Sequence, residues 1–140
     1  MRYAVDLGNS AAKAALRSGG ALRTYRVAAP PAGSDVATWS SRIDTLLDLI
    51  GSGPQAATAL RVASVVPTAT AAALEAAAAR GISVECIAVS DVPLRLAVAA
   101  PDRIGVDRVL AAWSAFERDG RPRGRGIVAV TLGTALTVTC

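Results

Sequence analysis

The 140-residue sequence contains no histidine. Histidine is the usual general base beside a serine or cysteine nucleophile, and it is a common zinc ligand. Its absence excludes serine–histidine and cysteine–histidine catalysis as well as the usual zinc sites. Any general base in this protein must therefore be an aspartate or a glutamate.

Cysteine and long apolar runs are also scarce. The two cysteines, Cys86 and Cys140, form neither a metal-binding spacing nor a disulfide framework. Cys86 lies in the apolar run "VECIAV", which predicts a small core residue. The longest uncharged tract, residues 126–140, is shorter than the roughly 18 residues of a spanning helix. Asp6 and Lys13 interrupt any signal-peptide core, so we expect a soluble, cytoplasmic protein that binds no membrane.

Lysine is nearly missing, although the net charge is +4. Lys13 is the only lysine among the 15 basic residues, which hints at a need for a compact ammonium charge at that position. The arginines are scattered except in "RDGRPRGRG", residues 118–126. No aromatic residues interleave with them, so we interpret this stretch as a solvated loop and expect no nucleic-acid binding.

With 52% hydrophobic and 19% charged residues, the chain can build a core and reads as one domain or as part of a larger one. Periodicity and turn residues predict strands, then helices alternating with strands, which is an α/β layer fold. The predicted strands span residues 2–7, 12–17, 21–28, 58–66 and 82–89, followed by a strand, a glycine turn and a strand within 126–140. The predicted helices span residues 36–50 with a cap at Ser34 or Asp35, 68–80 stopped by Gly81, and a third helix that ends at Gly120.

A strand–Leu–Gly–strand pattern occurs twice, as "AVDLGNSA" (4–11) and "AVTLGTAL" (129–136). Two hairpins with polar tips would suit a phosphate clamp, in which each turn offers backbone N–H groups and glycine lets the backbone approach an anion. The alternative is that two ordinary hairpins share Leu–Gly by chance.

Four short motifs together give the sequence a resemblance to the type III pantothenate kinases of the actin-like ATPase superfamily. The opening phosphate motif, approximately D-x-G-N-(T/S)-x-x-K, is matched by Asp6, Gly8, Asn9, Ser10 and Lys13. The remaining matches are "SVVP" at Ser64, Val65, Val66 and Pro67, the G-x-D-R motif at Gly105, Val106, Asp107 and Arg108, and part of a second phosphate motif at Gly133, Thr134, Ala135 and Thr137.

The resemblance implies an α/β fold of the actin-like, ribonuclease H-like type, with a mixed sheet and flanking helices. Residues 1–120 would form the N-terminal lobe, and 121–140 the first hairpin of an incomplete second lobe. The match covers the whole chain but only about the first half of a family member. Family members act as homodimers, so a homodimer is expected here as well.

The resemblance also implies residue roles. ATP phosphates would be bound by Asp6, Leu7, Gly8, Asn9, Ser10, Ala11, Ala12, Lys13, Gly133 and Thr134. Asp6 would help to hold Mg²⁺. Pantothenate would be bound by Gly105, Val106, Asp107 and Arg108. Asp107 would be the catalytic base for the primary hydroxyl of pantothenate, although an aspartate in the first turn of a helix can equally serve only to complement the helix dipole.

The sequence departs from the family pattern at two positions and in its expected extent, since it ends at Cys140, one strand after the second glycine turn. Thr131 stands where the family has an aspartate associated with K⁺ or NH₄⁺ binding, and a neutral hydroxyl does not supply that charge. Val98 or a neighbour stands where the family often has a tyrosine. The expected function is ATP-dependent phosphorylation of pantothenate to 4'-phosphopantothenate. The alternative is a truncated or non-catalytic relative, akin to the Bvg accessory factor members, that binds phosphate ligands or a partner without turnover.

Overall fold

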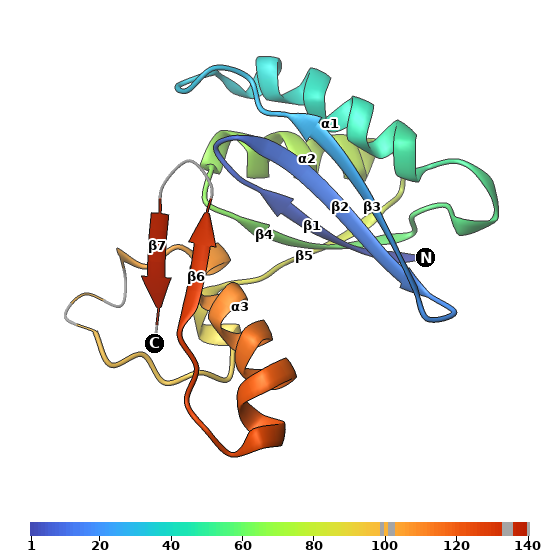
Figure 1. The fold of residues 1–140 in the computed structure, drawn as a ribbon. Coiled ribbons are helices and arrows are strands. Elements are labelled where there is room, and N and C mark those ends of the chain that lie inside the picture. Colours follow the sequence, from blue (N-terminus) through green and yellow to red (C-terminus); the bar gives the residue numbers. More distant parts are fainter. Residues whose placement is uncertain (99, 101–102, 133–135, 140) are drawn as a thin grey trace. The chain divides into compact units, whose positions relative to one another are not determined.

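The computed structural model describes residues 1–98, 100, 103–132 and 136–139 (Figure 1). The chain divides into two compact units, residues 1–87 and 88–140, each with a sheet of its own. This division falls within the lobe that was expected to reach residue 120, and the boundary near residue 120 stays a prediction.

The first unit is built on a five-stranded mixed sheet. Its strands are β1 (Arg2–Leu7), β2 (Ala11–Ser18), β3 (Ala21–Ala28), β4 (Ala59–Ser64) and β5 (Ser83–Cys86). The order is β3-β2-β1-β4-β5, with β2 antiparallel to β1 and β3, and with β4 parallel to β1 and β5. This arrangement is the ribonuclease H-like order of an actin-like lobe, and the predicted fold class is confirmed.

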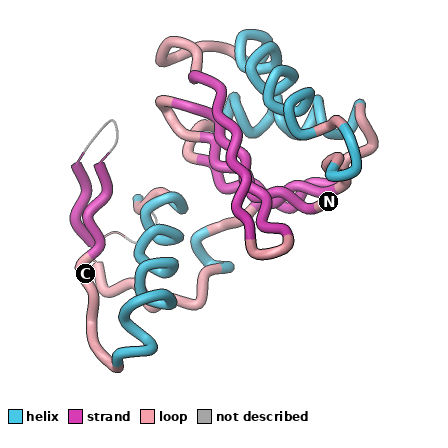
Figure 2. The backbone as a smooth tube through the Cα atoms, turned by 45° about the vertical axis from the view of Figure 1, so that its right-hand side comes forward, coloured by secondary structure: helices cyan, strands magenta, loops and turns pink. Residues whose placement is uncertain are grey.

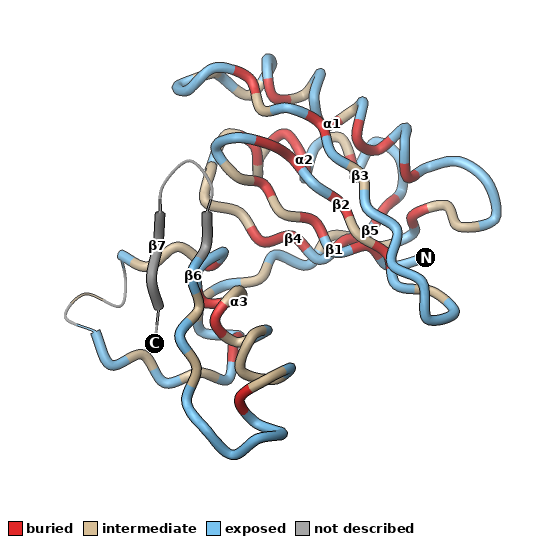
Figure 3. Tube along the Cα trace, viewed as in Figure 1, coloured by how far each residue is buried: buried red, intermediate tan, exposed pale blue. Residues whose placement is uncertain are grey.

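Two helices, α1 (Val36–Ile50) and α2 (Pro67–Ala79), cover one face of this sheet (Figure 2). The core lies between them and the strands, where Figure 3 shows the buried positions of the unit. It contains apolar side chains from every second position of the strands, such as Tyr3, Val5 and Leu7, and from α1, such as Trp39 and Ile43. The alternation leaves Ala4 and Asp6 of β1 on the opposite face.

Both helices begin and end close to the predicted positions. The carboxylate of Asp35 caps α1 by accepting hydrogen bonds from the Thr38 hydroxyl at 2.6 Å and the Thr38 N–H at 2.9 Å. These bonds hold the pKa of the Asp35 carboxyl below its usual range, so acidification through that lowered pKa removes the stabilisation they give. Pro67 is the first residue of α2, where its missing N–H costs nothing. Gly81 follows α2 with a φ of +66° and lets the chain turn back toward β5.

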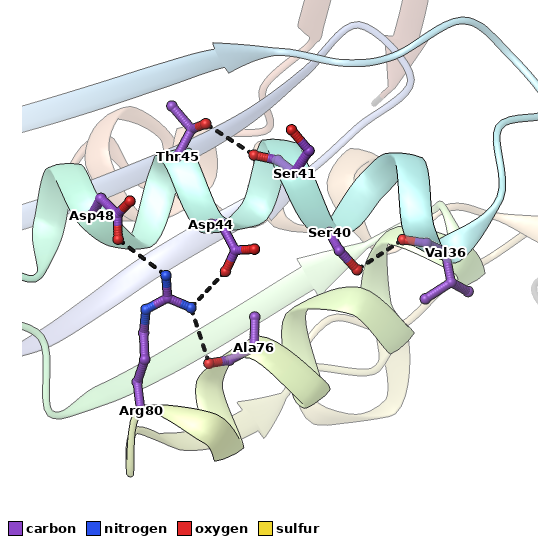
Figure 4. A network of polar contacts seen from close by, with 8 residues as sticks. All are labelled: Val36, Ser40, Ser41, Asp44, Thr45, Asp48, Ala76 and Arg80. Carbon is purple, nitrogen blue, oxygen red and sulfur yellow. Dashed lines mark hydrogen bonds and ion pairs between the residues drawn. The ribbon is translucent and has the colours of Figure 1, made fainter.

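Arg80, the C-cap of α2, ties the two helices together (Figure 4). Its guanidinium donates to Asp44 at 2.6 Å and to Asp48 at 3.0 Å, one turn apart on α1, and also to the carbonyl of Ala76 at 3.4 Å. A planar guanidinium can satisfy several acceptors at once, so this one side chain fixes α1 against the end of α2.

The second unit contains α3 (Val106–Ala115), a π-helical turn (Phe116–Gly120), a 3₁₀ turn (Arg121–Arg123), and a hairpin of β6 (Ala129–Leu132) and β7 (Leu136–Thr139). The expected helix end at Gly120 is corrected. The chain continues in helical turns through Gly120, whose φ is −78°, and Gly124, with a φ of +61°, is the left-handed residue after the last turn. The arginines expected to be solvated are exposed, and Arg118 and Arg123 both pair with Asp119, at 2.8 and 2.9 Å.

Gly120 is nevertheless sterically required, which gives a first prediction. A Cβ at Gly120 would lie 2.7 Å from a Phe116 ring carbon, 2.9 Å from an Ile127 methyl and 3.0 Å from the Arg125 carbonyl. We expect Gly120→Ala to cost about 1–3 kcal/mol of stability, as other overpacking substitutions do. Gly126→Ala is the matched control, because nothing lies within 4 Å of its added Cβ. Equal urea midpoints for the two variants would contradict the steric explanation.

Cys86 is a second correction, because it is exposed and was expected in the core. It is the last residue of β5, one of the two edge strands of the five-stranded sheet. An edge strand has a neighbouring strand on one side only, so an apolar run there is covered less than the same run in a central strand.

Among the described helices, none is long and apolar enough to cross a membrane.

Candidate functional site

The first predicted phosphate motif forms the β1–β2 hairpin. Strand pairing places Leu7 opposite Ala12, and the Gly8 N–H donates to the Ala11 carbonyl at 3.1 Å. The hairpin that was expected to offer backbone N–H groups to an anion therefore uses one of them, that of Gly8, for its own closure. Beyond this bond lie Asn9 and Ser10, both exposed, at the tip of the turn.

Gly8 is not demanded by the fold. Its φ is not in the left-handed region, and a Cβ there would meet only the Ala11 carbonyl at 3.7 Å and Asp6 Oδ1 at 4.0 Å, which are ordinary contacts. The described part of the chain would therefore accommodate a side chain at position 8. The absence of a side chain there agrees with a position at which a ligand approaches the backbone closely.

Asp6 and Lys13 lie directly opposite each other on β1 and β2. Lys13 Nζ is 3.1 Å from Asp6 Oδ2, and the two side chains are 55% and 42% exposed. Partners in an antiparallel pair share a face, and this is the face of the sheet opposite α1 and α2. The sequence motif thus brings a carboxylate and the only lysine of the chain together on an accessible surface. They form the second residue pair from the turn, next to the pair Leu7–Ala12.

The "SVVP" motif lies beside the same turn, at the carboxyl end of β4. Ser64 is paired with Leu7, and the Val65 N–H donates to the Leu7 carbonyl at 3.2 Å. The Ser64 hydroxyl accepts the Val66 N–H at 3.1 Å, which fixes the residue before α2. The motif joins the ends of β1 and β4 to the start of α2. This structural role explains the contacts that Ser64 and Val65 make.

The G-x-D-R motif begins α3, as predicted. Gly105 is the N-cap residue with extended backbone, and Val106 is the first helical residue and is buried. Asp107 and Arg108 follow in the first turn, and both are exposed. The buried Val106 and Val109 anchor the turn and leave the two charged side chains accessible.

The predicted residues thus form two groups, one in each unit. Asp6, the turn and Lys13 share the first unit with "SVVP", whereas residues 105–108 belong to the second unit. Gly133 and Thr134, predicted to bind phosphate from the second turn, lie outside the described residues. The second hairpin itself is present, with Leu132 of β6 paired to Leu136 of β7.

Comparison with known proteins identifies the family. The sequence matches the type III pantothenate kinase family over residues 3–140. The chain belongs to this family. None of the curated proteins shows significant similarity to it.

One solved structure similar to the chain is that of YeaZ from Pseudomonas aeruginosa. The identity is 15% and the TM-score is 0.43, and the match covers 100% of this chain and 65% of that one. The chain therefore spans less than two thirds of the length of this structural neighbour.

Membership in the type III pantothenate kinase family implies ATP and a divalent metal, and the donor set can be tested against the metal. The described residues contain no cluster of three or more acidic, histidine or cysteine side chains. Mg²⁺ is commonly held by one or two carboxylates together with water and substrate phosphates, and a single accessible carboxylate such as Asp6 fits that mode. The residues therefore fit a metal that arrives with a nucleotide rather than one bound by the protein alone.

One residue near the Asp6–Lys13 pair was not singled out from the sequence. Arg26 on β3 lies directly opposite Lys13 on β2. No motif includes it, and only the register of the strand pairing reveals its position.

Proposed function

We propose that this protein catalyses the ATP-dependent phosphorylation of pantothenate to 4'-phosphopantothenate, the first step of coenzyme A synthesis. The observation that supports this best is the accessible Asp6–Lys13 pair, 3.1 Å apart, beside a glycine turn in a chain of the type III pantothenate kinase family. The G-x-D-R motif at the start of α3 supports the choice of acceptor.

Phosphoryl transfer demands mainly positioning and charge neutralisation. Lys13 would neutralise phosphate charge, and the turn at Asn9 and Ser10 would position the phosphates. Asp6 would hold Mg²⁺, which supplies further charge neutralisation at the phosphate oxygens when it is bound with ATP.

Asp107 would accept the proton of the primary hydroxyl of pantothenate. The hydroxyl oxygen would form a bond to the γ-phosphorus before this proton has fully left, while the bond from this phosphorus to the bridging oxygen breaks, which releases ADP. Arg108, the next residue in the same first turn, would bind pantothenate beside it. A carboxylate suffices as the base because the proton can leave late in a loose transition state.

The direct test is product formation. Purified protein should convert pantothenate and ATP with Mg²⁺ to 4'-phosphopantothenate and ADP in equal amounts, as followed by mass spectrometry. The reaction should be run separately in sodium, potassium and ammonium salts, because Thr131 replaces the family's cation-binding aspartate. Absence of product in all three salts would overturn the proposal.

A second candidate is a non-catalytic relative, akin to the Bvg accessory factor members, that binds phosphate ligands or a partner without turnover. Thr131 favours this candidate, because the family's associated carboxylate charge is missing there. Binding of ATP without product formation in the same assay is the result expected of it.

A further inference from the structure

The Asp6–Lys13 pair is part of a longer row of charged residues. Lys13 is paired with Asp6 on β1 and with Arg26 on β3. Directly opposed residues of antiparallel strands share a face, and neighbouring strands lie about 4.8 Å apart. Arg26, Lys13 and Asp6 therefore form a line across three strands on the face opposite α1 and α2.

The charges in this row do not cancel. Like charges placed directly opposite each other on neighbouring strands destabilise a sheet. Lys13 has Asp6 as its counter-ion at 3.1 Å, whereas Arg26 is exposed and makes no ion pair with any residue of the described part of the chain. The row thus carries two cations and one carboxylate, and an anion between the cations would relieve their repulsion.

The row also lies close to the turn of the proposed nucleotide site. Ala28 is paired with Ala11, and the Ala29 N–H donates to the Ser10 carbonyl at 3.1 Å. The end of β3 therefore runs alongside the β1–β2 turn, and Arg26 lies two residues before the position that faces Ala11.

We propose that Arg26 is a further phosphate-binding residue, which together with Lys13 holds the polyphosphate of the nucleotide. This inference rests on the proposed function and adds a residue to the same site. A guanidinium donates through a planar fork that matches two phosphate oxygens, whereas an ammonium acts as a compact point charge, so the two cations have complementary tasks.

If Arg26 had a purely structural role, its replacement would be expected to leave ligand binding unchanged. β3 is an edge strand of the sheet, and charged residues on edge strands discourage pairing with other chains. If that were its only task, Arg26 could be neutralised without any effect on ligand binding.

Arg17 provides the matched control. It lies on β2 on the same face as Lys13, is exposed, and also makes no ion pair within the described residues. It is four residues from Lys13, which corresponds to about 13 Å along the strand, more than the Debye length of about 8 Å in physiological salt. Arg17→Gln and Arg26→Gln change the net charge equally.

The experiment measures affinity for ATP and for inorganic tripolyphosphate by calorimetry at fixed ionic strength. We expect Arg26→Gln to weaken the binding of both ligands by about 10- to 100-fold, the usual worth of a charge-assisted contact. Arg26→Lys should fall between this variant and the wild type, because it keeps the charge and loses the fork. Arg17→Gln should change either affinity by less than about twofold.

Two results would overturn the inference, and they differ in what else they overturn. If the wild type binds tripolyphosphate, Lys13→Ala weakens that binding, and Arg26→Gln behaves like Arg17→Gln, only the role of Arg26 fails. If the wild type binds neither ATP nor tripolyphosphate, the proposed function fails together with it. If Arg26→Gln does not fold, Arg26→Lys is the variant to measure. If Arg26→Lys then binds both ligands as tightly as the wild type, the inference is contradicted.

Discussion

Substitution of Asp107 by asparagine is expected to lower turnover of pantothenate by roughly 10²–10⁴-fold, the usual worth of general-base catalysis. Asparagine keeps the shape of the side chain and a polar residue in the first turn of α3, but it cannot accept the hydroxyl proton. The affinity for ATP should barely change, because Asp107 is proposed to act on the acceptor and not on the phosphates. Steady-state assays with ATP and pantothenate varied in turn measure the turnover, and calorimetry measures the affinity for ATP.

The competing explanation for Asp107 moves a different quantity. If its carboxylate only complements the dipole of α3, the substitution should cost about 0.3–1 kcal/mol of stability and leave turnover nearly intact. Asp35→Asn is a suitable control because Asp35 caps α1 through Thr38 and belongs to no proposed site. That variant should lose stability and keep its turnover. Nearly unchanged turnover in Asp107→Asn would remove this residue from the mechanism.

Much of the fold could be predicted because local chemistry fixes it. An aspartate cap before an apolar helical stripe predicts α1, and the observed helix has the predicted bounds of 36–50. Proline at the start and glycine after the end predict α2 to within one residue. These signals act over a few residues and depend little on the rest of the chain, so the sequence carries them directly.

The expectations that failed depend on what surrounds a residue. Cys86 lies in an apolar run, but its exposure follows from the place of β5 at the edge of the sheet, which is a property of the whole topology. Gly120 was expected to end a helix through its conformational freedom. It is instead enclosed by Phe116 and Ile127, a contact that no local pattern announces.

The candidate site shows the same division. The motifs predict which residues belong to it, and the first hairpin brings Asp6 and Lys13 together as the motif spacing implies. The use of the Gly8 N–H within the hairpin and the position of Arg26 opposite Lys13 follow from strand register. Register is set by the pairing of three strands, so one strand's sequence does not reveal it.

Replacement of Lys13 by alanine is expected to weaken ATP binding by about 10- to 100-fold, which corresponds to loss of one charge-assisted contact. Two effects contribute to this loss. The ammonium that would neutralise phosphate charge is removed, and, when no Mg²⁺ is bound at Asp6, that carboxylate is left without its partner at 3.1 Å and repels the polyphosphate. Lys13→Arg should retain part of the affinity, because it restores the charge but not the compact geometry.

Stability separates this effect from a folding defect. The side chains of Lys13 and Asp6 are 55% and 42% exposed, and ion pairs so accessible to water contribute only about 0–1 kcal/mol. Lys13→Ala should therefore unfold at nearly the same urea concentration as the wild type while its calorimetric affinity for ATP falls. A folded Lys13→Ala protein that binds ATP as tightly as the wild type would exclude Lys13 from the nucleotide site. The only lysine in the chain would then have no part in phosphate binding, and its ion pair with Asp6 would be a surface contact of the sheet.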